Sequence, residues 1–343
     1  MVTRKRSFTK FILLLSLTTL SANALAETQQ EIEARIRALD AELYQLRQQL
    51  QQVENSEDAS LDLPFELLPE EVAREDLSDR RQFEQESSRN PFSITTHHTN
   101  YLFPISYNTN QNRESFRSIS EDSSANGAEL KFQFSAKVNL AEEIFGDYGD
   151  VYFGYTQRSW WQAYNTDASS PFRETNYEPE VFIDFDNAWS ALGWVNTRNR
   201  ISLNHQSNGR SSPLSRSWNR VYLESTFQSG NWALTLAPHW RIPESESEDD
   251  NPDIERFMGY GDVRLAKRLN NNHEVSGQLR GNPSAGNIGT QIDYSWPAFS
   301  SLRAHLQYYY GYGESMIDYD HRVHRLSLGF SLNPLFSASG LNR

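Results

Sequence analysis

Residues 129–140 read Glu-Leu-Lys-Phe-Gln-Phe-Ser-Ala-Lys-Val-Asn-Leu, in which polar and apolar side chains alternate without a break. Successive side chains of an extended strand point to opposite faces, so this stretch predicts a strand with one apolar and one polar face. The same alternation recurs at Trp232, Leu234 and Leu236, and again from Leu326 to Leu332. From about residue 91 onward, the chain is therefore predicted to be all-β.

Twelve segments with this period can be counted, an even number, as expected for a bacterial outer-membrane barrel. Their approximate ranges are 93–107, 127–140, 149–163, 177–186, 189–207, 217–227, 231–243, 256–269, 272–283, 286–296, 300–312 and 320–334. The connections alternate between long, as at 108–126, 164–176 and 244–255, and short, as at 228–230 and 270–271. Long extracellular loops and short periplasmic turns give this rhythm, so we expect a 12-stranded antiparallel transmembrane β-barrel.

Composition agrees with a barrel in the bacterial outer membrane. Aromatic side chains make up 13% of the 343 residues, and the chain has no cysteine, which excludes disulfides as a source of stability. Cysteine-free, aromatic-rich strands are typical of outer-membrane barrels, whose aromatic girdles meet the lipid head groups. The formal net charge is −13. This acidity argues against nucleic acid as a partner, because binding to phosphates needs basic side chains.

Residues 1–26 are predicted to be a cleavable secretory signal peptide. Four basic residues lie at positions 4, 5, 6 and 10, the stretch Phe11–Leu20 is mostly apolar, and Ala24–Ala26 has the A-x-A cleavage pattern. The apolar run is shorter than the roughly 20 residues that a membrane-anchoring helix needs. Removal of this segment takes the formal net charge from −13 to −17.

The next segments are predicted to differ from the barrel. Residues 27–55 carry apolar side chains at the alternating 4-3 spacing of a heptad seam: Ile32, Ile36, Leu39, Leu43, Leu46, Leu50 and Val53. We expect an N-terminal periplasmic helix that promotes self-association; an amphipathic helix folded back on the barrel mouth is the alternative. Residues 56–90 are acidic and polar and predict a linker. The barrel is assigned to 91–336, and 337–343 form a C-terminal tail.

His205 and Ser207 lie at positions i and i+2 of a predicted strand. Their side chains therefore share one face, which also carries Ile201 and Leu203 and is the lipid-facing one. If both ends of the barrel are periplasmic, this end of the strand lies at the outer surface and the loop 208–216 is extracellular. The polar pair is then expected on the barrel exterior, near the outer leaflet.

The following strand returns with Asn219 on the same side. A serine hydroxyl becomes a useful nucleophile when a base removes its proton and a third group orients the base. Ser207, His205 and Asn219 can supply these roles if the two strands pair in register. The backbone N–H groups of Ser207 and Gly209 are candidate donors to an oxyanion. The spacing alone is weak evidence for a catalytic site. The alternative is that these are polar residues near a loop that have no catalytic role.

The longer stretch Asn204–Arg220 closely resembles the active-site segment of the outer membrane phospholipase A family. The resemblance covers about residues 95–336 and includes Ser169–Pro179, Gln157–Gln162, Asp250–Asp253 and Gly311–Tyr319. It implies a calcium-dependent, homodimeric, 12-stranded barrel that hydrolyses sn-1 and sn-2 acyl esters of phospholipids and lysophospholipids. Carried over by position, Ser207 is the nucleophile, His205 the base and Asn219 the orienting residue.

The same resemblance implies a Ca²⁺ site shared between two subunits. The Arg210 carbonyl and the Ser215 hydroxyl of one subunit and the Ser169 carbonyl of the other would bind the ion. Because these ligands are neutral oxygens, the affinity should be modest. Neither subunit alone completes the site, so activity is expected to depend on dimerisation, with the active site facing the outer leaflet.

Gln157 resembles the family's polar residue at the dimer contact. It also continues the predicted lipid-facing parity of Phe153 and Tyr155, and an unpaired amide facing hydrocarbon would be costly. An interface across which Gln157 finds a partner is therefore expected. The alternative is a glutamine that reaches the head groups, with Trp160 and Trp161 as the aromatic girdle.

The chain departs from the family pattern at several places. Ser212 and Gln206 stand where the best-known members carry aspartates, which puts an acidic, dimer-independent calcium site in doubt. Residues 337–343 follow Phe336, whereas such barrels usually end on the aromatic residue. The heptad helix at 27–55 is also outside the core pattern.

Other polar residues are given no catalytic role. The acid-rich segment Glu244–Asp253 is interpreted as a solvated extracellular loop, and Glu314 and Asp318 as parts of a polar loop network. No role is assigned to the remaining histidines considered: His97, His98, His239, His305, His321 and His324.

Two other functions fit a barrel of this kind. One is a non-catalytic pore or scaffold, and the other is a barrel hydrolase that acts on the acyl chains of lipopolysaccharide. A pore or scaffold would release no fatty acid. The other hydrolase would release fatty acid from lipopolysaccharide rather than from phospholipid.

Overall fold

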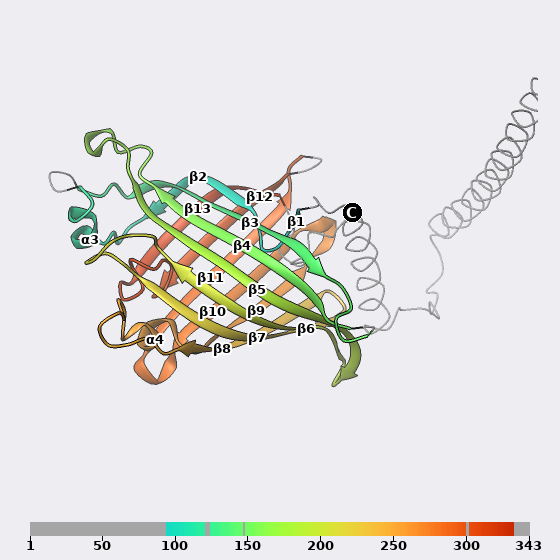
Figure 1. Ribbon diagram of the computed structural model, residues 1–343. Helices are drawn as coiled ribbons and strands as arrows, with labels where there is room; N and C mark the ends of the chain where they lie inside the picture. The colour runs from blue at the N-terminus through green and yellow to red at the C-terminus, as the bar shows by residue number, and fades with distance from the viewer. Residues whose placement is uncertain (1–93, 121–123, 147, 300–301, 333–343) are drawn as a thin grey trace, which may run out of the picture. The chain divides into compact units, whose positions relative to one another are not determined.

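The computed structural model describes residues 94–120, 124–146, 148–299 and 302–332 (Figure 1). Twelve antiparallel strands, each hydrogen-bonded to its neighbours in sequence, form a ring that closes between the last strand and the first. They are β2 (Tyr101–Asn108), β3 (Ala128–Ala141), β4 (Asp150–Trp161), β5 (Phe172–Ala191), β6 (Trp194–Ser207), β7 (Ser217–Ser229), β8 (Trp232–Ile242), β9 (Gly261–Arg268), β10 (Glu274–Asn282), β11 (Asn287–Pro297), β12 (Arg303–Gly311) and β13 (Val323–Ser331). The predicted 12-stranded barrel is confirmed. The predicted segments 1–26, 27–55, 56–90 and 337–343 lie outside the described residues.

The alternation that predicted the strands separates the outside of the barrel from the inside. Phe134 is 54% exposed and Leu326 53% exposed, whereas Glu129 and Lys131 are buried. The apolar face is thus the outer one and the polar face lines the lumen, the reverse of a soluble protein and the arrangement that lipid requires. Within the described ranges, no helix has the length and apolar character needed to cross a bilayer.

The β5–β6 hairpin corrects the predicted strand boundaries. A turn was expected near residues 187–188, but the chain turns at Leu192 and Gly193, both with positive φ. At the expected turn the strands instead shift register, and Asn187 donates its side-chain amide to the Phe185 carbonyl. Asn at this position favours a local bend, and a β-bulge satisfies that tendency without ending the strand.

Several further boundaries differ from the prediction; β5, for example, begins at Phe172 rather than near residue 177. The first strand is divided into a short β1 (Thr95–Thr96) and β2. The segment predicted as a strand from residue 256 begins as the helix α4 (Ile254–Met258), and β9 starts only at Gly261.

The long connections carry the short helices. The helix α3 (Arg113–Arg117) follows β2, and α4 follows β8; Figure 1 shows both at the same end of the barrel. A 3₁₀ turn (Thr166–Ala168) lies between β4 and β5. The opposite connections are short, as between β5 and β6 and between β7 and β8. The predicted rhythm of long and short connections is therefore present.

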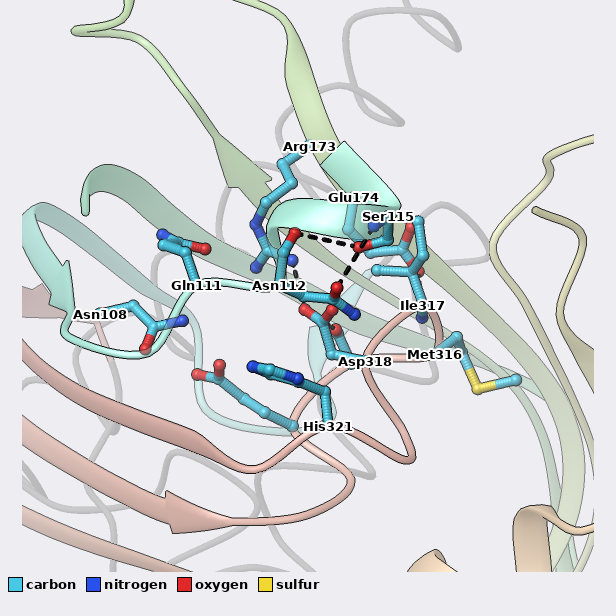
Figure 2. Close-up of polar contacts among 12 residues, drawn as sticks. Asn108, Gln111, Asn112, Ser115, Arg173, Glu174, Met316, Ile317, Asp318 and His321 are labelled. Atoms are coloured by element: carbon cyan, nitrogen blue, oxygen red, sulfur yellow. Dashed lines mark hydrogen bonds and ion pairs between the residues drawn. The ribbon is translucent and has the colours of Figure 1, made fainter. Parts of the chain in front are cut away.

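Buried charges cross-link the lumen beneath the long loops. Arg173 at the start of β5 donates to Glu129 on β3 at 2.6 Å and also to Asp318 in the β12–β13 loop. Arg325 on β13 binds Glu129 at 2.7 Å and Glu314 at 2.9 Å. Figure 2 shows Arg173 and Asp318 pointing toward each other. The interpretation of Glu314 and Asp318 as parts of a polar loop network agrees with these contacts.

Glu314 belongs to that loop and is buried together with its cationic partners. Burial by itself would raise the pKa of its carboxyl group. The Arg325 guanidinium and the Lys131 ammonium outweigh the burial and lower the pKa to about 2. The carboxylate therefore stays ionised at neutral pH and holds the loop inside the mouth of the barrel.

Replacing Arg173 with Met should destabilise the barrel strongly. The substitution removes the ion pair of the buried Asp318, while Glu129 keeps its contact with Arg325. Breaking a buried ion pair from one side typically costs about 3–5 kcal/mol. Urea unfolding of the reconstituted protein, followed by tryptophan fluorescence, measures the loss. Arg117→Met on the exposed side of α3 is the matched control. Equal losses in the two variants would contradict a special contribution from the network.

Candidate active site

His205 and Ser207 lie at the end of β6, and Asn219 lies near the start of β7. His205 and Asn219 are register partners, as are Ser207 and Ser217. Leu203, on the same face of β6, is 57% exposed, whereas Gln206 is buried. The structure thus places the three side chains on the outer face of the barrel, at the end with the long loops.

A hydrogen-bonded chain begins at the imidazole. Nδ1 of His205 lies 2.8 Å from Oδ1 of Asn219. The amide nitrogen of Asn219 donates in turn to Oε1 of Glu244 at 3.1 Å. Glu244 follows β8 directly and is itself 3.8 Å from the Arg241 guanidinium. The carboxylate is therefore the last acceptor in a chain of three residues from three successive strands or their ends.

This chain decides where the imidazole proton lies. A carboxylate only accepts, so Glu244 requires the NH₂ group of Asn219 to point toward it. The carbonyl oxygen of Asn219 must then face His205, and because that oxygen only accepts, Nδ1 carries the hydrogen. Nε2 of the neutral ring is left with a free lone pair. The ring is thus oriented to act as a base through Nε2.

The buried side chain of Asn208 bridges the loop between β6 and β7. Its amide donates to the Leu214 carbonyl at 2.9 Å, and its Oδ1 accepts from the backbone N–H groups of Arg210 and Arg216. Gly209 follows with φ +63°, and a Cβ there would lie 3.0 Å from the Tyr177 ring. Only glycine fits this conformation and approach readily, so the turn beside Ser207 is fixed.

The side chain of Arg210 is anchored to the start of β5. Its guanidinium donates to the Arg173 carbonyl at 2.7 Å and lies 3.4 Å from Glu174. Glu174 also accepts from the backbone N–H of Ile317 at 3.0 Å, which Figure 2 shows beside it. The loop that carries Arg210 is therefore tied to the charged network in the lumen.

Ser215 and Ser169 are the other positions predicted to bind calcium. The Ser215 hydroxyl donates to Asp250 at 2.5 Å. Ser169 ends the 3₁₀ turn between β4 and β5 with φ +59°. Hard oxygen donors and a nearby carboxylate are the chemistry that Ca²⁺ prefers, so the residues around Ser215 fit this ion.

The segment Glu244–Asp253 is mostly exposed, as predicted for a solvated loop, but several of its acidic side chains also have fixed partners. Besides the contacts of Glu244 and Asp250, Asp249 binds Arg241 at 2.6 Å, and Asp253 accepts from the Tyr319 hydroxyl at 2.6 Å. Burial and Asp253 together raise the pKa of Tyr319. The partners of Asp250 and Asp253 lie 35 and 66 residues away along the chain, so composition alone does not reveal these contacts.

Gln157 lies on the outer face of β4, as its parity predicted. The Tyr155 hydroxyl donates to its carbonyl at 3.1 Å, and its amide donates to Ser159 at 3.3 Å. The side chain thus already has partners within one chain, which weakens the argument that an unpaired amide requires an interface. Of the two girdle residues named in the alternative, Trp160 does not fit, because it is fully buried, with the Lys131 ammonium 5.5 Å from its ring.

Gln206 faces the lumen between the two outward-facing residues. Its carbonyl accepts from the Trp218 indole at 2.9 Å and from Arg220 at 3.0 Å. Arg220 also binds Asn204 at 2.8 Å and Glu178 at 3.1 Å. Hydrogen bonds among polar side chains in the lumen therefore hold β6 and β7, the strands that carry the candidate site, in place.

Comparisons with known proteins identify the family of this chain. The family model described as "Phospholipase A1" matches residues 77–332. The phospholipase A1 of Klebsiella pneumoniae is 40% identical over 247 residues, 72% of this chain and 85% of that protein. That of Escherichia coli K12 is 38% identical over 247 residues, 72% of this chain and 84% of that protein.

Solved structures give the same result. Outer membrane phospholipase A from Escherichia coli has a TM-score of 0.68 at 37% identity, covering 72% of this chain and 94% of that one. The Salmonella typhi enzyme, solved as a dimer with bound calcium, has a TM-score of 0.69 at 36% identity and covers 74% of this chain and 97% of that one. The chain therefore belongs to the phospholipase A1 family and is a phospholipase of the outer membrane.

Proposed function

We propose that the protein hydrolyses sn-1 and sn-2 acyl esters of phospholipids and lysophospholipids through Ser207, His205 and Asn219, with Ca²⁺ and as a homodimer. The observation that carries the proposal is the 2.8 Å contact between His205 and Asn219 on the outer, lipid-facing side of the barrel. At this position the site would meet phospholipid in the outer leaflet.

The orientation of the imidazole assigns the proton transfers. As the Ser207 oxygen attacks the ester carbonyl, its proton passes to Nε2 of His205, and the same proton is then donated to the departing lysophospholipid oxygen. Water hydrolyses the acyl-enzyme by the reverse sequence, with His205 again as the base. Asn219 holds the ring through both steps, and the N–H groups of Ser207 and Gly209 are the proposed oxyanion donors.

The proposed calcium site combines oxygen donors of the β6–β7 loop with one from the β4–β5 connection of a second subunit. The Arg210 carbonyl and the Ser215 hydroxyl of one subunit and the Ser169 carbonyl of a second would hold the ion. When bound, Ca²⁺ would supply positive charge near the developing oxyanion. The 2.5 Å contact of Ser215 with Asp250 supports a site of higher affinity than neutral oxygens alone would give. Gln157 is the residue proposed to lie at the dimer contact.

Glu244 is proposed as a positioning residue. Its carboxylate fixes the orientation of the Asn219 amide and, through it, the tautomer of His205. It also places a negative charge at one remove from the ring that becomes cationic during catalysis. Although Asn219 is neutral, the charge of Glu244 behind it would thereby provide part of the stabilisation of the imidazolium that a carboxylate would give.

Replacing Ser207 with Ala should abolish turnover, with a loss of about 10⁴-fold or more in kcat, because the substitution removes the proposed nucleophile. Fatty-acid release from phospholipid micelles measures the loss. The variant should keep the heat-resistant mobility of a folded barrel on a gel. Retained activity would remove Ser207 as the nucleophile, and release from lipopolysaccharide but not phospholipid would favour the alternative hydrolase.

Removal of calcium with EDTA should abolish activity, and Ser215→Ala should raise the Ca²⁺ concentration for half-maximal activity by about tenfold or more, since one ligand is lost. Activity titrated against free Ca²⁺ measures the shift. Ser211→Ala, at an exposed position of the same loop, is the control. Activity that persists in EDTA would contradict the metal requirement.

Replacing Glu244 with Leu should lower kcat by about tenfold with little change in KM, because the loss of one hydrogen bond, worth about 1.4 kcal/mol, frees the Asn219 amide to flip. Glu244→Gln should restore most of the activity, since its carbonyl still accepts from Asn219. Glu246→Leu, at an exposed position two residues on, is the control. A rise in KM alone would indicate a role in lipid binding rather than in positioning.

A further inference from the structure

Two consecutive histidines lie in a bulge where the chain enters the barrel. Thr96 pairs with Ala136, and Tyr101 pairs with Gln133, so the four residues 97–100 oppose only two residues of β3. A bulge of this kind re-aims side chains that would otherwise alternate between the two faces. Both His97 and His98 consequently lie close to the same carboxylate.

That carboxylate belongs to Glu180 on β5. Nε2 of His97 lies 2.6 Å from Oε1 of Glu180, and Nε2 of His98 lies 3.8 Å from the same oxygen. One ligand atom from each of the three residues falls within 4.8 Å of the others. The two imidazole rings are 4.0 Å apart, centroid to centroid.

The surrounding residues keep this cluster in place. Ser135 accepts from the backbone N–H of His98 through its hydroxyl at 3.0 Å, and its own N–H donates to Asn100 at 2.7 Å. The His97 ring stacks on Phe182 at 5.0 Å. On β4, between the bulge and β5, Gly154 leaves the space that the ring fills, because a Cβ there would lie 3.2 Å from His97. Three strands thus contribute to one built site.

We propose that His97, His98 and Glu180 form a lumenal binding site for a borderline transition-metal ion such as Zn²⁺, distinct from the calcium site on the outer face. Two imidazoles and one carboxylate are a zinc ligand set that leaves a fourth position open. Zinc-bound nitrogen and oxygen atoms in a tetrahedron lie about 3.4 Å apart, between the 2.6 and 3.8 Å found here. Small side-chain movements would therefore complete the coordination.

The neighbourhood is compatible with a cation. Arg200, Lys137 and Arg264 are basic side chains close enough to act on the two histidines. Arg200 is bound by both oxygens of Asp184, at 2.6 and 2.8 Å, and Arg264 lies 3.3 Å from Glu224, so these two charges are locally compensated. His98 and Glu180 both line a lumenal cavity of about 300 Å³, which gives an ion and its water access to the site. Imidazole donors also separate this site from calcium, which prefers oxygen.

The proposal does not depend on the catalytic assignment, and it is tested by binding. Untagged, refolded full-length protein in detergent, stripped with chelator and held in excess Ca²⁺, is titrated with Zn²⁺ against a chromophoric competitor. We expect one Zn²⁺ per chain, and a loss of affinity of about tenfold or more in His98→Ala and in Glu180→Gln. His305→Asn, in which a lumenal histidine bound to Asp293 is replaced, should bind as the wild type does.

Cobalt gives an independent measurement on the wild type. Co²⁺ in a site with two imidazoles and a carboxylate should show visible absorption of four- or five-coordinate geometry, lost on addition of one equivalent of Zn²⁺. Heat-resistant gel mobility identifies the folded variants. Absence of stoichiometric Zn²⁺ binding by the wild type, or equal affinity in folded His98→Ala, would overturn the proposal.

Discussion

The shared ion pairs of Arg173 are the constraint on which the rest of the structure depends. A barrel with an apolar exterior must fill its interior with polar groups, and every buried charge there needs a partner. Arg173 meets this need for Glu129 and Asp318 at once, so it joins β3, β5 and the β12–β13 loop. The next residue, Glu174, extends the same connection to Arg210 beside the active site. Stability in the lumen and geometry on the outer face are thereby linked through two consecutive residues.

In the part of the barrel wall formed by β6 and β7, strand parity places the candidate catalytic residues on the outer face and the residues that hold the strands on the lumenal face. His205 and Ser207 face lipid, whereas Asn204 and Gln206 face the lumen and are bound by Arg220. Each outward-facing residue is thus flanked by neighbours that are fixed from inside. A site built on strands in this way keeps its geometry without packing around the outward side chains themselves, which leaves that face open to lipid.

The strands and their faces could be predicted from the sequence because both follow a period of two that is local. The pairing of His205 with Asn219 followed from the same parity plus an assumed register, which the structure confirms. Turns were harder: Asn187 favours a turn and instead forms a bulge, because the hairpin beyond it continues to pair. The contacts of Glu244 and the approach of His97 to Glu180 could not be predicted. They depend on loop paths and on a bulge that brings residues 83 positions apart into contact.

The contact of Asn219 with Glu244 also bears on why, in the proposed mechanism, an amide can stand where other serine hydrolases use a carboxylate. A carboxylate beside the histidine would accept from Nδ1–H but would carry an uncompensated charge on the lipid-facing side whenever the ring is neutral, and burying such a charge is costly. An amide avoids that cost but stabilises the imidazolium less. Placing the charge one residue further back, on Glu244 beside Arg241, keeps it compensated and near the polar loops. The amide then transmits the effect as a polarised hydrogen-bond chain, which is strengthened by the low dielectric of its surroundings.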